Sequence, residues 1–451
     1  MTGTVHLGEL MGRPRIGPVR ALVVVLCALV ALFDGMDLQI IGLAAPAIAA
    51  DLRIPAASLG AVFSAAIAGM AIGGLVLAPL ADRVGRKVVL VAAVLCFGAF
   101  TLATMAANAV TALLAFRFAT GLGLGAAIPS AISLASEFVP AHRRATVAGL
   151  LFAGFPVGGV LAGLLGSRLI PTAGWHGLFL VGGIAPLVVA VVVVVSLPES
   201  PVFLVARRAP VRRIARTLAR VAPELTIDAS TRFTGVEQRE RRAPVGQLFA
   251  TGRRANTLLL WAASFTSFGV LVVNSSWTPT LLAPLGVPVA RTAVALALFN
   301  AGSVVATAAG GWLITRFGVR RVLPSAFALA AAGVTGIGVA APSVSGVIGM
   351  QILIGVGLGC ASSGVIGLAA VAYRTAIRST GVGWALGVGR VGSFVGPLLV
   401  AALVAAAWPV AGVFAVLGAV CLVGGLAAAA LRQARHARQA RMGPSPSEGT
   451  A

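Results

Sequence analysis

The sequence predicts an all-α membrane protein with twelve transmembrane helices in two pseudo-symmetric six-helix halves. Three observations predict this fold. Hydrophobic residues make up 59% of the 451-residue chain and charged residues only 10%. The apolar residues fall into long runs, and motifs of the first half recur in the second. Because a water-soluble domain carries about 25% charged residues, most of this chain has the composition of a protein in contact with lipid.

The individual membrane helices are predicted from the lengths of these apolar runs. A helix needs roughly 20 mostly apolar residues to cross the hydrocarbon core of a bilayer. The first run is long and lacks a small-residue cleavage site, so we interpret it as a membrane helix and not as a signal peptide. The runs that are long enough cover approximately residues 21–48, 59–81, 88–107, 110–138, 145–167, 176–197, 256–282, 291–314, 322–341, 344–372, 380–405 and 409–431.

One long hydrophilic segment divides the runs into six and six. It is rich in arginine, and within it an amphipathic helix is predicted over Val211–Val221, lying on anionic lipid. The expected segments are a cytoplasmic N-tail (1–20), an N-terminal half (21–197), a cytoplasmic basic linker (198–255), a C-terminal half (256–431) and a cytoplasmic C-tail (432–451).

The distribution of positive charge predicts the orientation. The formal net charge is +22, and most of the 34 Lys and Arg residues fall in segments on one side of the predicted membrane. Only Arg53, Arg168 and Arg291 lie in connections on the other side. The positive-inside rule then places both termini in the cytoplasm, and we expect the inner (plasma) membrane of a bacterium. Nucleic-acid binding is disfavoured because no soluble domain remains for it.

The repeat is clearest in the runs 110–138 and 344–372 and the segments that follow them. At a shift of 234 residues, Gly121, Gly123, Gly125, Arg144, Thr146 and Gly149 match Gly355, Gly357, Gly359, Arg378, Thr380 and Gly383. Such repeats are typical of transporters in which a binding site lies between two similar halves. The alternative is a chance match between two segments rich in glycine and alanine.

Two aspartates, Asp34 and Asp37, interrupt the first apolar run. A charge at the centre of a membrane helix costs at least ~2.5 kcal/mol on insertion scales, so such residues usually have a function. Their spacing of three residues places both on one face of a helix. They are predicted to carry protons as a coupled unit; the alternative is a structural role at a helix break near Gly35.

No other part of the chain supplies many substitutes for these acids. None of the twelve Asp and Glu residues lies between Arg241 and Ser447, so the C-terminal half lacks a membrane carboxylate. Glu137, near the end of the run 110–138, is the third candidate for proton coupling. Its alternative is an ion pair with Arg143 or Arg144.

Arg117 and Arg390 lie inside predicted membrane helices. The guanidinium group binds a carboxylate through two parallel hydrogen bonds, so both are predicted to bind the carboxylate of a substrate. Arg390 is the stronger candidate because its own half offers no acid partner. The alternative is an ion pair with Asp34 or Asp37, which a substrate could displace.

Several further side chains are predicted to line the binding site. Phe265, Trp277 and Trp384 suit a flat apolar ligand, and Asn274 is a polar neighbour. The alternative is that these side chains only pack or face lipid. Neither a nucleophile–base set nor a metal-ligand spacing is evident, so we expect no catalytic residue, no metal, no enzyme activity and no cofactor other than the proton as coupling ion.

The loop after the second run is predicted to act as a conformational latch between two states. Its alternating charges stand on a tight turn at a helix end, and the alternative is an ordinary solvated basic loop. The residues of this latch are Asp82, Arg83, Gly85, Arg86 and Lys87.

The loop LADRVGRK resembles the signature loop of the major facilitator superfamily, with Ala78 where a glycine is usual. DGMD at 34–37, LPESPVFL at 197–204, SSWTPTLL at 275–282 and RSTGVGWALGVGRVGSFVGP at 378–397 are similar to segments of its aromatic acid:proton symporters. The resemblance implies the superfamily's fold and proton-coupled import of a benzoate or hydroxybenzoate. It also implies that the DGMD acids and the two membrane arginines are important.

The expected function is therefore that of a proton-coupled secondary transporter that imports a small aromatic carboxylate by alternating access, as a monomer in the bilayer. The alternatives are a proton-coupled transporter of another organic acid, a sugar or another metabolite, an exporter of drugs or metabolites, and a membrane sensor of aromatic acids.

Overall fold

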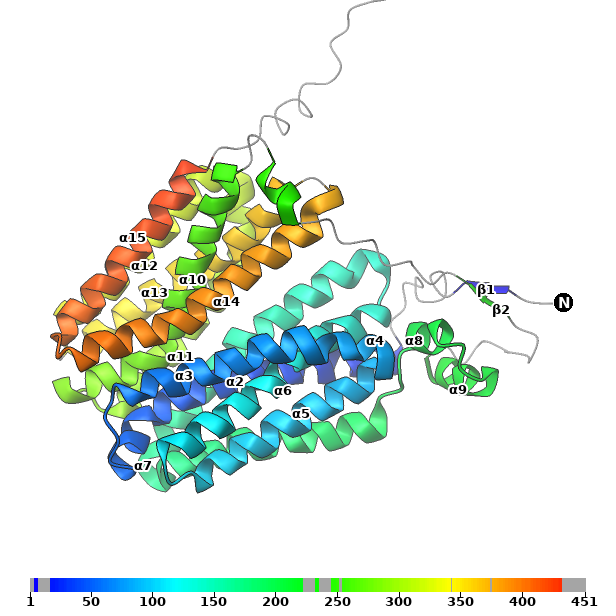
Figure 1. Ribbon diagram of the computed structural model, residues 1–451, viewed down its shortest axis with the longest axis horizontal. Coiled ribbons are helices and arrows are strands. Elements are labelled where there is room, and N and C mark those ends of the chain that lie inside the picture. Colours follow the sequence, from blue (N-terminus) through cyan, green and yellow to red (C-terminus); the bar gives the residue numbers. More distant parts are fainter. Residues whose placement is uncertain are drawn as a thin grey trace, which may run out of the picture.

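The computed structural model describes residues 4–6, 17–221, 232–234, 245–250, 254–341, 343–373 and 375–431. Within these residues, eleven helices are long and apolar enough to cross a membrane. Figure 1 shows them as two groups, one from each half of the chain. The N-terminal group consists of α2 (Pro18–Asp51), α3 (Ser58–Ile72), α5 (Arg86–Ala103), α6 (Val110–Glu137) and α7 (Arg144–Ser196). The C-terminal group consists of α10 (Arg254–Leu282), α11 (Val289–Phe317), α12 (Val319–Ala340), α13 (Val344–Ala372), α14 (Thr375–Ala405) and α15 (Val410–Ala430).

The number of helices differs from the predicted twelve because α7 contains two of the predicted runs. This element is 53 residues long, and its Gly174 is not helical, with φ of 65° and ψ of −171°. A positive φ is accessible to glycine without steric cost, so the chain leaves the helical path at this residue. The predicted helices 145–167 and 176–197 lie on either side of Gly174.

Short elements complete the fold. Two three-residue strands that the sequence did not indicate, β1 (Thr4–His6) and β2 (Arg232–Thr234), form a parallel pair. The helix predicted over residues 211–221 is confirmed as α9 (Val211–Val221). The remaining short elements are the helices α4 (Ala81–Val84) and α8 (Pro201–Ala206), the π-helix Gly73–Leu77, and the 3-10 turns Ala78–Leu80, Thr104–Ala106, Ala141–Arg143, Val245–Phe249 and Ala283–Leu285.

Matching glycines in α6 and α13 confirm the internal repeat. A Cβ on Gly121 of α6 would lie 2.0 Å from the carbonyl oxygen of Ala66 in α3. A Cβ on Gly355 of α13 would lie 2.0 Å from the carbonyl oxygen of Phe299 in α11. Without a side chain, the backbones approach closely and pack tightly in a membrane. The same crossing of helices is therefore built twice.

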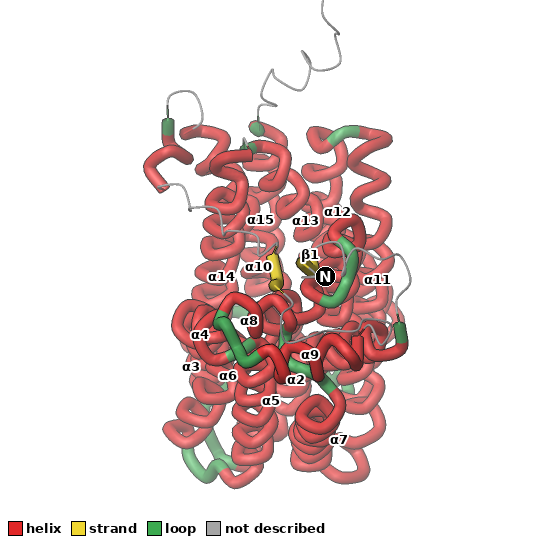
Figure 2. Tube along the Cα trace, turned by 90° about the vertical axis from the view of Figure 1, so that its right-hand side faces the viewer, coloured by secondary structure: helices red, strands yellow, loops and turns green. Residues whose placement is uncertain are grey.

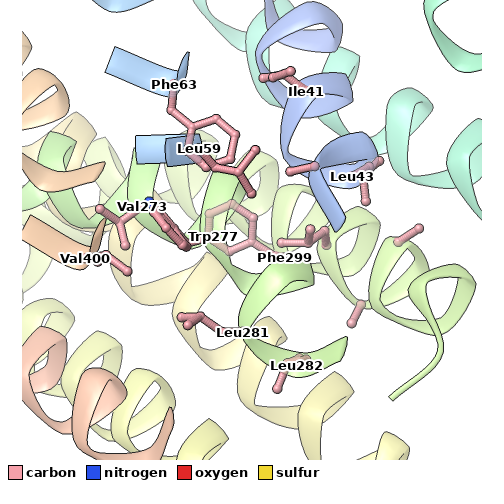
Figure 3. Close-up of a cluster of buried hydrophobic side chains, with 14 of the residues drawn as sticks. Ile41, Leu43, Leu59, Phe63, Val273, Trp277, Leu281, Leu282, Phe299 and Val400 are labelled. Carbon is pink, nitrogen blue, oxygen red and sulfur yellow. The ribbon is translucent and has the colours of Figure 1, made fainter. Parts of the chain in front are cut away.

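The two halves pack against each other at one end of the molecule. Figure 3 shows the apolar cluster there, to which α2, α3, α10, α11 and α14 contribute. The buried ring of Trp277 meets Phe63 edge-on, with centroids 5.6 Å apart. A Cβ on Gly42 would lie only 2.4 Å from the carbonyl oxygen of Ser275, so glycine is needed where α2 crosses α10. Towards the end that carries α8 and α9, the two groups of helices diverge (Figure 1).

Candidate functional site

Asp37 and Arg117 form a buried ion pair inside the N-terminal half. Arg117 Nη2 lies 2.5 Å from Asp37 Oδ2 and Nη1 donates to Oδ1 at 3.3 Å. The hydroxyl of Thr101 in α5 also donates to Oδ1, at 2.7 Å. Neither charged side chain is exposed. Because removing one partner would leave an unpaired charge in a low-dielectric interior, this pair holds α2 to α6.

Asp34 lies one helical turn away and has a different environment. It is only 3% exposed, and its Oδ1 has no hydrogen-bond partner within the described residues. It interacts electrostatically with Arg390 of the opposite half and with Asp37. Arg390 is accessible to solvent although it stands in the middle of α14. Since its electrostatic partner belongs to the other half, Arg390 faces the interface between the halves.

A narrow, mostly apolar cavity with a few amide and hydroxyl groups in its wall begins beside Asp34, at Gly35. It offers about 30 Å³ that water can enter, which is room for one or two molecules. Gln39 and Asn300 bridge the two halves in its wall, with Asn300 Nδ2 donating to Gln39 Oε1 at 3.2 Å. The wall is formed by Gly35, Leu38, Gln39, Ile41, Phe63, Ala66, Ile67, Phe155, Leu271, Val272, Ser275, Ser276 and Asn300. The cavity therefore lies between the two halves, which both contribute to its wall.

Asn274 and Trp277, both predicted to bind substrate, lie within the C-terminal half. The amide of Asn274 exchanges two hydrogen bonds with Gln351, of 3.0 and 3.2 Å. Asn274 and Trp277 both line a packing gap that has no room for a water molecule. Trp277 is fully buried against Phe63. Arg390 does not line this gap.

The two other aromatic candidates lie along α10 and α14. The ring of Trp384 stacks on Trp261, with centroids 5.5 Å apart, and is 43% exposed. Phe265 is half-buried, and its carbonyl oxygen would lie 2.1 Å from a Cβ on Gly392. Phe265 therefore lies where α10 crosses α14, at a contact two residues along α14 from Arg390.

Glu137, the third predicted proton carrier, is separate from Asp34 and Asp37. It stands at the end of α6, where it accepts a hydrogen bond from the Ser200 hydroxyl and pairs with Arg86 Nε at 3.1 Å. The alternative partners considered from sequence were Arg143 and Arg144, but the described ion pair is with Arg86. Glu137 thus belongs to the predicted latch and not to the central site.

The latch residues are brought together around the acidic side chain of Glu199. The backbone N–H of Lys87 donates to Glu199 Oε1 at 3.1 Å. Gly85 has a φ of 125°, and a Cβ there would lie 2.4 Å from Glu199 Oε2. Asp82 Oδ1 pairs with Arg86 Nη2 at 3.2 Å. The latch loop is therefore a fixed network in this conformation, and not a freely solvated loop.

Arg83 joins the same network through its backbone, because its carbonyl oxygen accepts a 2.5 Å hydrogen bond from Arg207. The network ties the turn between α4 and α5 to both ends of α8, through Glu199 before it and Arg207 after it. Within the described residues, no group of three or more His, Cys, Asp or Glu side chains could hold a metal ion.

Sequence reasoning missed four polar residues of these networks. Glu199 and Ser200 belong to the LPESPVFL segment, whose paired acid and hydroxyl before a helix start could have indicated an anchor for the basic latch. Gln39 and Asn300 are each the only amide side chain in a long apolar run, and this rarity could have indicated a polar contact inside the membrane.

Comparisons with known proteins agree with this architecture. A family model described as Major Facilitator Superfamily matches residues 27–297 and again residues 259–449. The chain is 39% identical to the 4-hydroxybenzoate transporter PcaK of Pseudomonas aeruginosa, over 87% of this chain and 88% of that protein. It is 36% identical to a gallate transporter of Pseudomonas putida, over 92% of each.

Among solved structures, the chain is similar to a bacterial homologue of the human lysosomal transporter Spinster in an inward-facing and occupied conformation. The TM-score is 0.71 at 18% identity, over 92% of this chain and 96% of that one. The resemblance inferred from the sequence motifs is confirmed, and a family of transporters agrees with the expectation that the chain is not an enzyme. This multi-pass membrane protein belongs to the Major Facilitator Superfamily.

Proposed function

We propose that this protein is a proton-coupled secondary transporter that imports a small aromatic carboxylate of the benzoate or hydroxybenzoate class. One observation carries the proposal: the buried carboxylate of Asp34 lies in the field of Arg390, which comes from the opposite half. The names of the relatives, which are transporters of 4-hydroxybenzoate and gallate, support the class of substrate.

The proposed chemistry follows from the exchange of partners at Arg390. Without substrate, Asp34 supplies the negative charge that Arg390 attracts. When Asp34 takes up a proton, the guanidinium becomes available to a substrate carboxylate, which it binds through two parallel hydrogen bonds. The proton then neutralises Asp34, and the substrate carboxylate neutralises Arg390. This lowers the free-energy cost of closing a low-dielectric site around these groups.

Asp37 has a different proposed role from Asp34. It stays paired with Arg117 and keeps α2 in register with α6, so that Asp34 is held at the interface. The ion pair between Asp37 and Arg117 therefore positions the proton site. Glu137 acts in the latch, where loss of its charge would release Arg86.

Transport by this mechanism requires the halves, residues 21–197 and 256–431, to rock about the central site. We place both termini in the cytoplasm of a bacterial cell because the basic segments gather on their side of the membrane. The side on which the halves diverge carries α8 and α9 (Figure 1), so the conformation described would be open to the cytoplasm. A monomer contains all the residues invoked.

The experiment is uptake of labelled 4-hydroxybenzoate into liposomes that contain the purified protein. We expect accumulation only with an inward proton gradient, and competition by benzoate and gallate but not by hexanoate or xylose. Equal competition by hexanoate would show that the ring is not recognised, and competition by xylose would favour a sugar transporter.

The proton site is tested separately with Asp34→Asn. This variant should still exchange labelled for unlabelled substrate across the membrane, because Arg390 no longer has a competing carboxylate. It should not concentrate substrate when a proton gradient is applied. Accumulation at the wild-type level would remove Asp34 from the coupling mechanism.

A further inference from the structure

A large cavity lies on the outside of the N-terminal half, away from the central site. Its volume is about 840 Å³, and it is bounded by the beginning of α5, the end of α7 with the segment that follows, and α9. Figure 2 shows α9 at the same end of the molecule as α8. The lining residues are Lys87, Val88, Val91, Ala92, Leu95, Val194, Leu197, Pro198, Glu199, Arg213, Arg216, Thr217 and Arg220.

One end of this cavity is strongly cationic. Arg213, Arg216 and Arg220 follow each other at spacings of three and four residues, so they lie on one face of α9. All three are exposed, whereas Ile214 and Leu218 of the opposite face are buried against the N-terminal half. The arginines are therefore held at the cavity by a helix that is anchored through its apolar face.

The protein groups that line the cavity neutralise only part of its positive charge. Its only acid among the described residues, Glu199, accepts hydrogen bonds from the backbone N–H groups of Lys87 and Ser200. Lys87 donates from Nζ to the carbonyl oxygen of Val194 at 2.7 Å, and it is attracted by Glu199 and more weakly repelled by Arg220. Four basic side chains gathered around one acid that already accepts two backbone hydrogen bonds indicate a site for an anion.

The rest of the cavity is an apolar wall that continues along two membrane helices. Val88 and Leu95 of α5 are 49% and 42% exposed, and Val194 of α7 is 50% exposed. Val88 and Leu95 stand two helical turns apart, so the wall runs from the cationic end into the depth of the bilayer. A free phosphate ion would use only the cationic end and would leave this wall unexplained.

We propose that this cavity binds an anionic phospholipid. Its phosphate lies between Lys87 and the arginines of α9, and its acyl chains lie against α5 and α7. Basic pockets on the cytoplasmic side of membrane proteins recognise anionic headgroups in this way. The bound lipid fastens α9 to the N-terminal half. The proposal does not depend on the identity of the substrate, although the site shares Lys87 and Glu199 with the latch.

The test is native mass spectrometry of the full-length protein, purified and incubated with equal amounts of phosphatidylglycerol and phosphatidylcholine. We expect the wild-type protein to retain more phosphatidylglycerol than phosphatidylcholine. The variant Arg213→Gln/Arg216→Gln/Arg220→Gln should lose this preference, since each basic residue near an anionic lipid contributes about fivefold to binding. The matched control is Arg316→Gln/Arg320→Gln/Arg321→Gln, which removes three exposed arginines near the junction of α11 and α12 and should retain wild-type preference.

Each outcome supports or overturns the proposal. Equal retention of the two lipids by wild type would overturn it, as would an equal loss of preference in the control variant. Displacement of the lipid by millimolar inorganic phosphate would identify a free-anion site instead. If the α9 variant fails to fold, the single variant Val91→Trp, which fills the apolar wall without changing charge, should lower retention of phosphatidylglycerol. Unchanged retention in that variant would contradict the placement of the acyl chains.

Discussion

The two halves of this protein have the same backbone architecture but different polar chemistry at corresponding positions. Gln351 of α13 lies 234 residues after Arg117 of α6, in the register of the repeat. Arg117 forms a buried ion pair with Asp37, whereas Gln351 forms a neutral amide pair with Asn274. Both pairs tie the first helix of a half to its fourth. The comparison shows that both halves keep a polar contact between these two helices, but only in the N-terminal half is that contact an ion pair.

The residues of the proposed transport site depart from the repeat altogether. A Cβ on Gly158 would lie 1.9 Å from the carbonyl oxygen of Leu32, and one on Gly392 would lie 2.1 Å from that of Phe265. At the shift of 233 residues that relates Leu32 to Phe265, Asp34 corresponds to Ser267. At the shift of 234 that relates Gly158 to Gly392, Arg390 corresponds to Pro156. An acid of one half thus faces a base of the other, and neither has a charged counterpart. A symmetric scaffold carries one asymmetric site.

The largest expected difference between the halves concerns the two buried pairs. Arg117→Ala should destabilise the protein by about 3–5 kcal/mol, because it leaves the Asp37 carboxylate buried and unpaired. Gln351→Ala should cost about 1–3 kcal/mol, since only a neutral amide of Asn274 loses its partner. Thermal unfolding in detergent measures both. Equal losses would mean that the charge of the first pair has no special importance.

A double variant sharpens this comparison. Asp37→Asn/Arg117→Gln gives the N-terminal half the amide chemistry of the C-terminal half. It should recover most of the stability that Arg117→Ala loses, because no unpaired charge remains. A double variant as unstable as Arg117→Ala would show that the geometry of the ion pair, and not its charge balance, is what holds α2 to α6.

The next effect concerns the base of the central site. Arg390→Gln should weaken binding of 4-hydroxybenzoate about 10- to 100-fold, because a charge-assisted hydrogen bond contributes about 1.5–3 kcal/mol. The affinity of Arg390→Lys should lie between those of wild type and Arg390→Gln, because lysine keeps the charge but lacks the planar guanidinium group. Arg378→Gln, which changes an exposed arginine at the start of the same helix, is the control for α14. Wild-type affinity in Arg390→Gln, measured by substrate-induced thermal shift, would remove Arg390 as the anchor.

A smaller difference is expected between two turns, the one that joins α4 to α5 in the N-terminal half and the one that joins α11 to α12 in the C-terminal half. Gly85 and Gly318 both have positive φ, of 125° and 81°, but only a Cβ on Gly85 would meet another group, the Glu199 carboxylate at 2.4 Å. Gly318→Ala should cost only the strain of a left-handed backbone, about 1–2 kcal/mol. Gly85→Ala should cost more and should also slow transport, because it displaces Glu199 from the latch. Transport rates that are equal in the two variants would argue against a latch.

The sequence predicted the scaffold well because lipid imposes simple rules on it. The lengths of the apolar runs predicted the membrane helices. The exception is α7, in which two predicted runs form one element that is interrupted only at Gly174. The repeat predicted the matching glycine contacts of α6 and α13. The helix over residues 211–221 was predicted because its arginines and apolar residues alternate at helical spacing.

The polar networks were harder to predict because they depend on distances between remote segments. The possible ion pair of Arg117 with an aspartate of α2 was considered, but the choice of Asp37 over Asp34 depends on the geometry of the packed helices. Glu199 lies 112 residues after Lys87, and nothing local in the sequence indicates their hydrogen bond. Nothing local in the sequence indicates that the amide of Asn274, predicted to contact substrate, pairs with that of Gln351, 77 residues away.

The smallest expected difference tests the symmetric part of the comparison. Gly121→Ala and Gly355→Ala each place a Cβ 2.0 Å from a backbone carbonyl oxygen, so neither can be accommodated without moving a helix. Overpacking of this kind costs about 1–3 kcal/mol, and because the two crossings match, the two losses should agree within about 0.5 kcal/mol. Gly149→Ala and Gly383→Ala, where nothing lies within 4 Å, are the matched controls and should be nearly neutral. If Gly121→Ala cost much more than Gly355→Ala, the N-terminal half would be the more tightly constrained. The asymmetry would then extend from the charges to the scaffold itself.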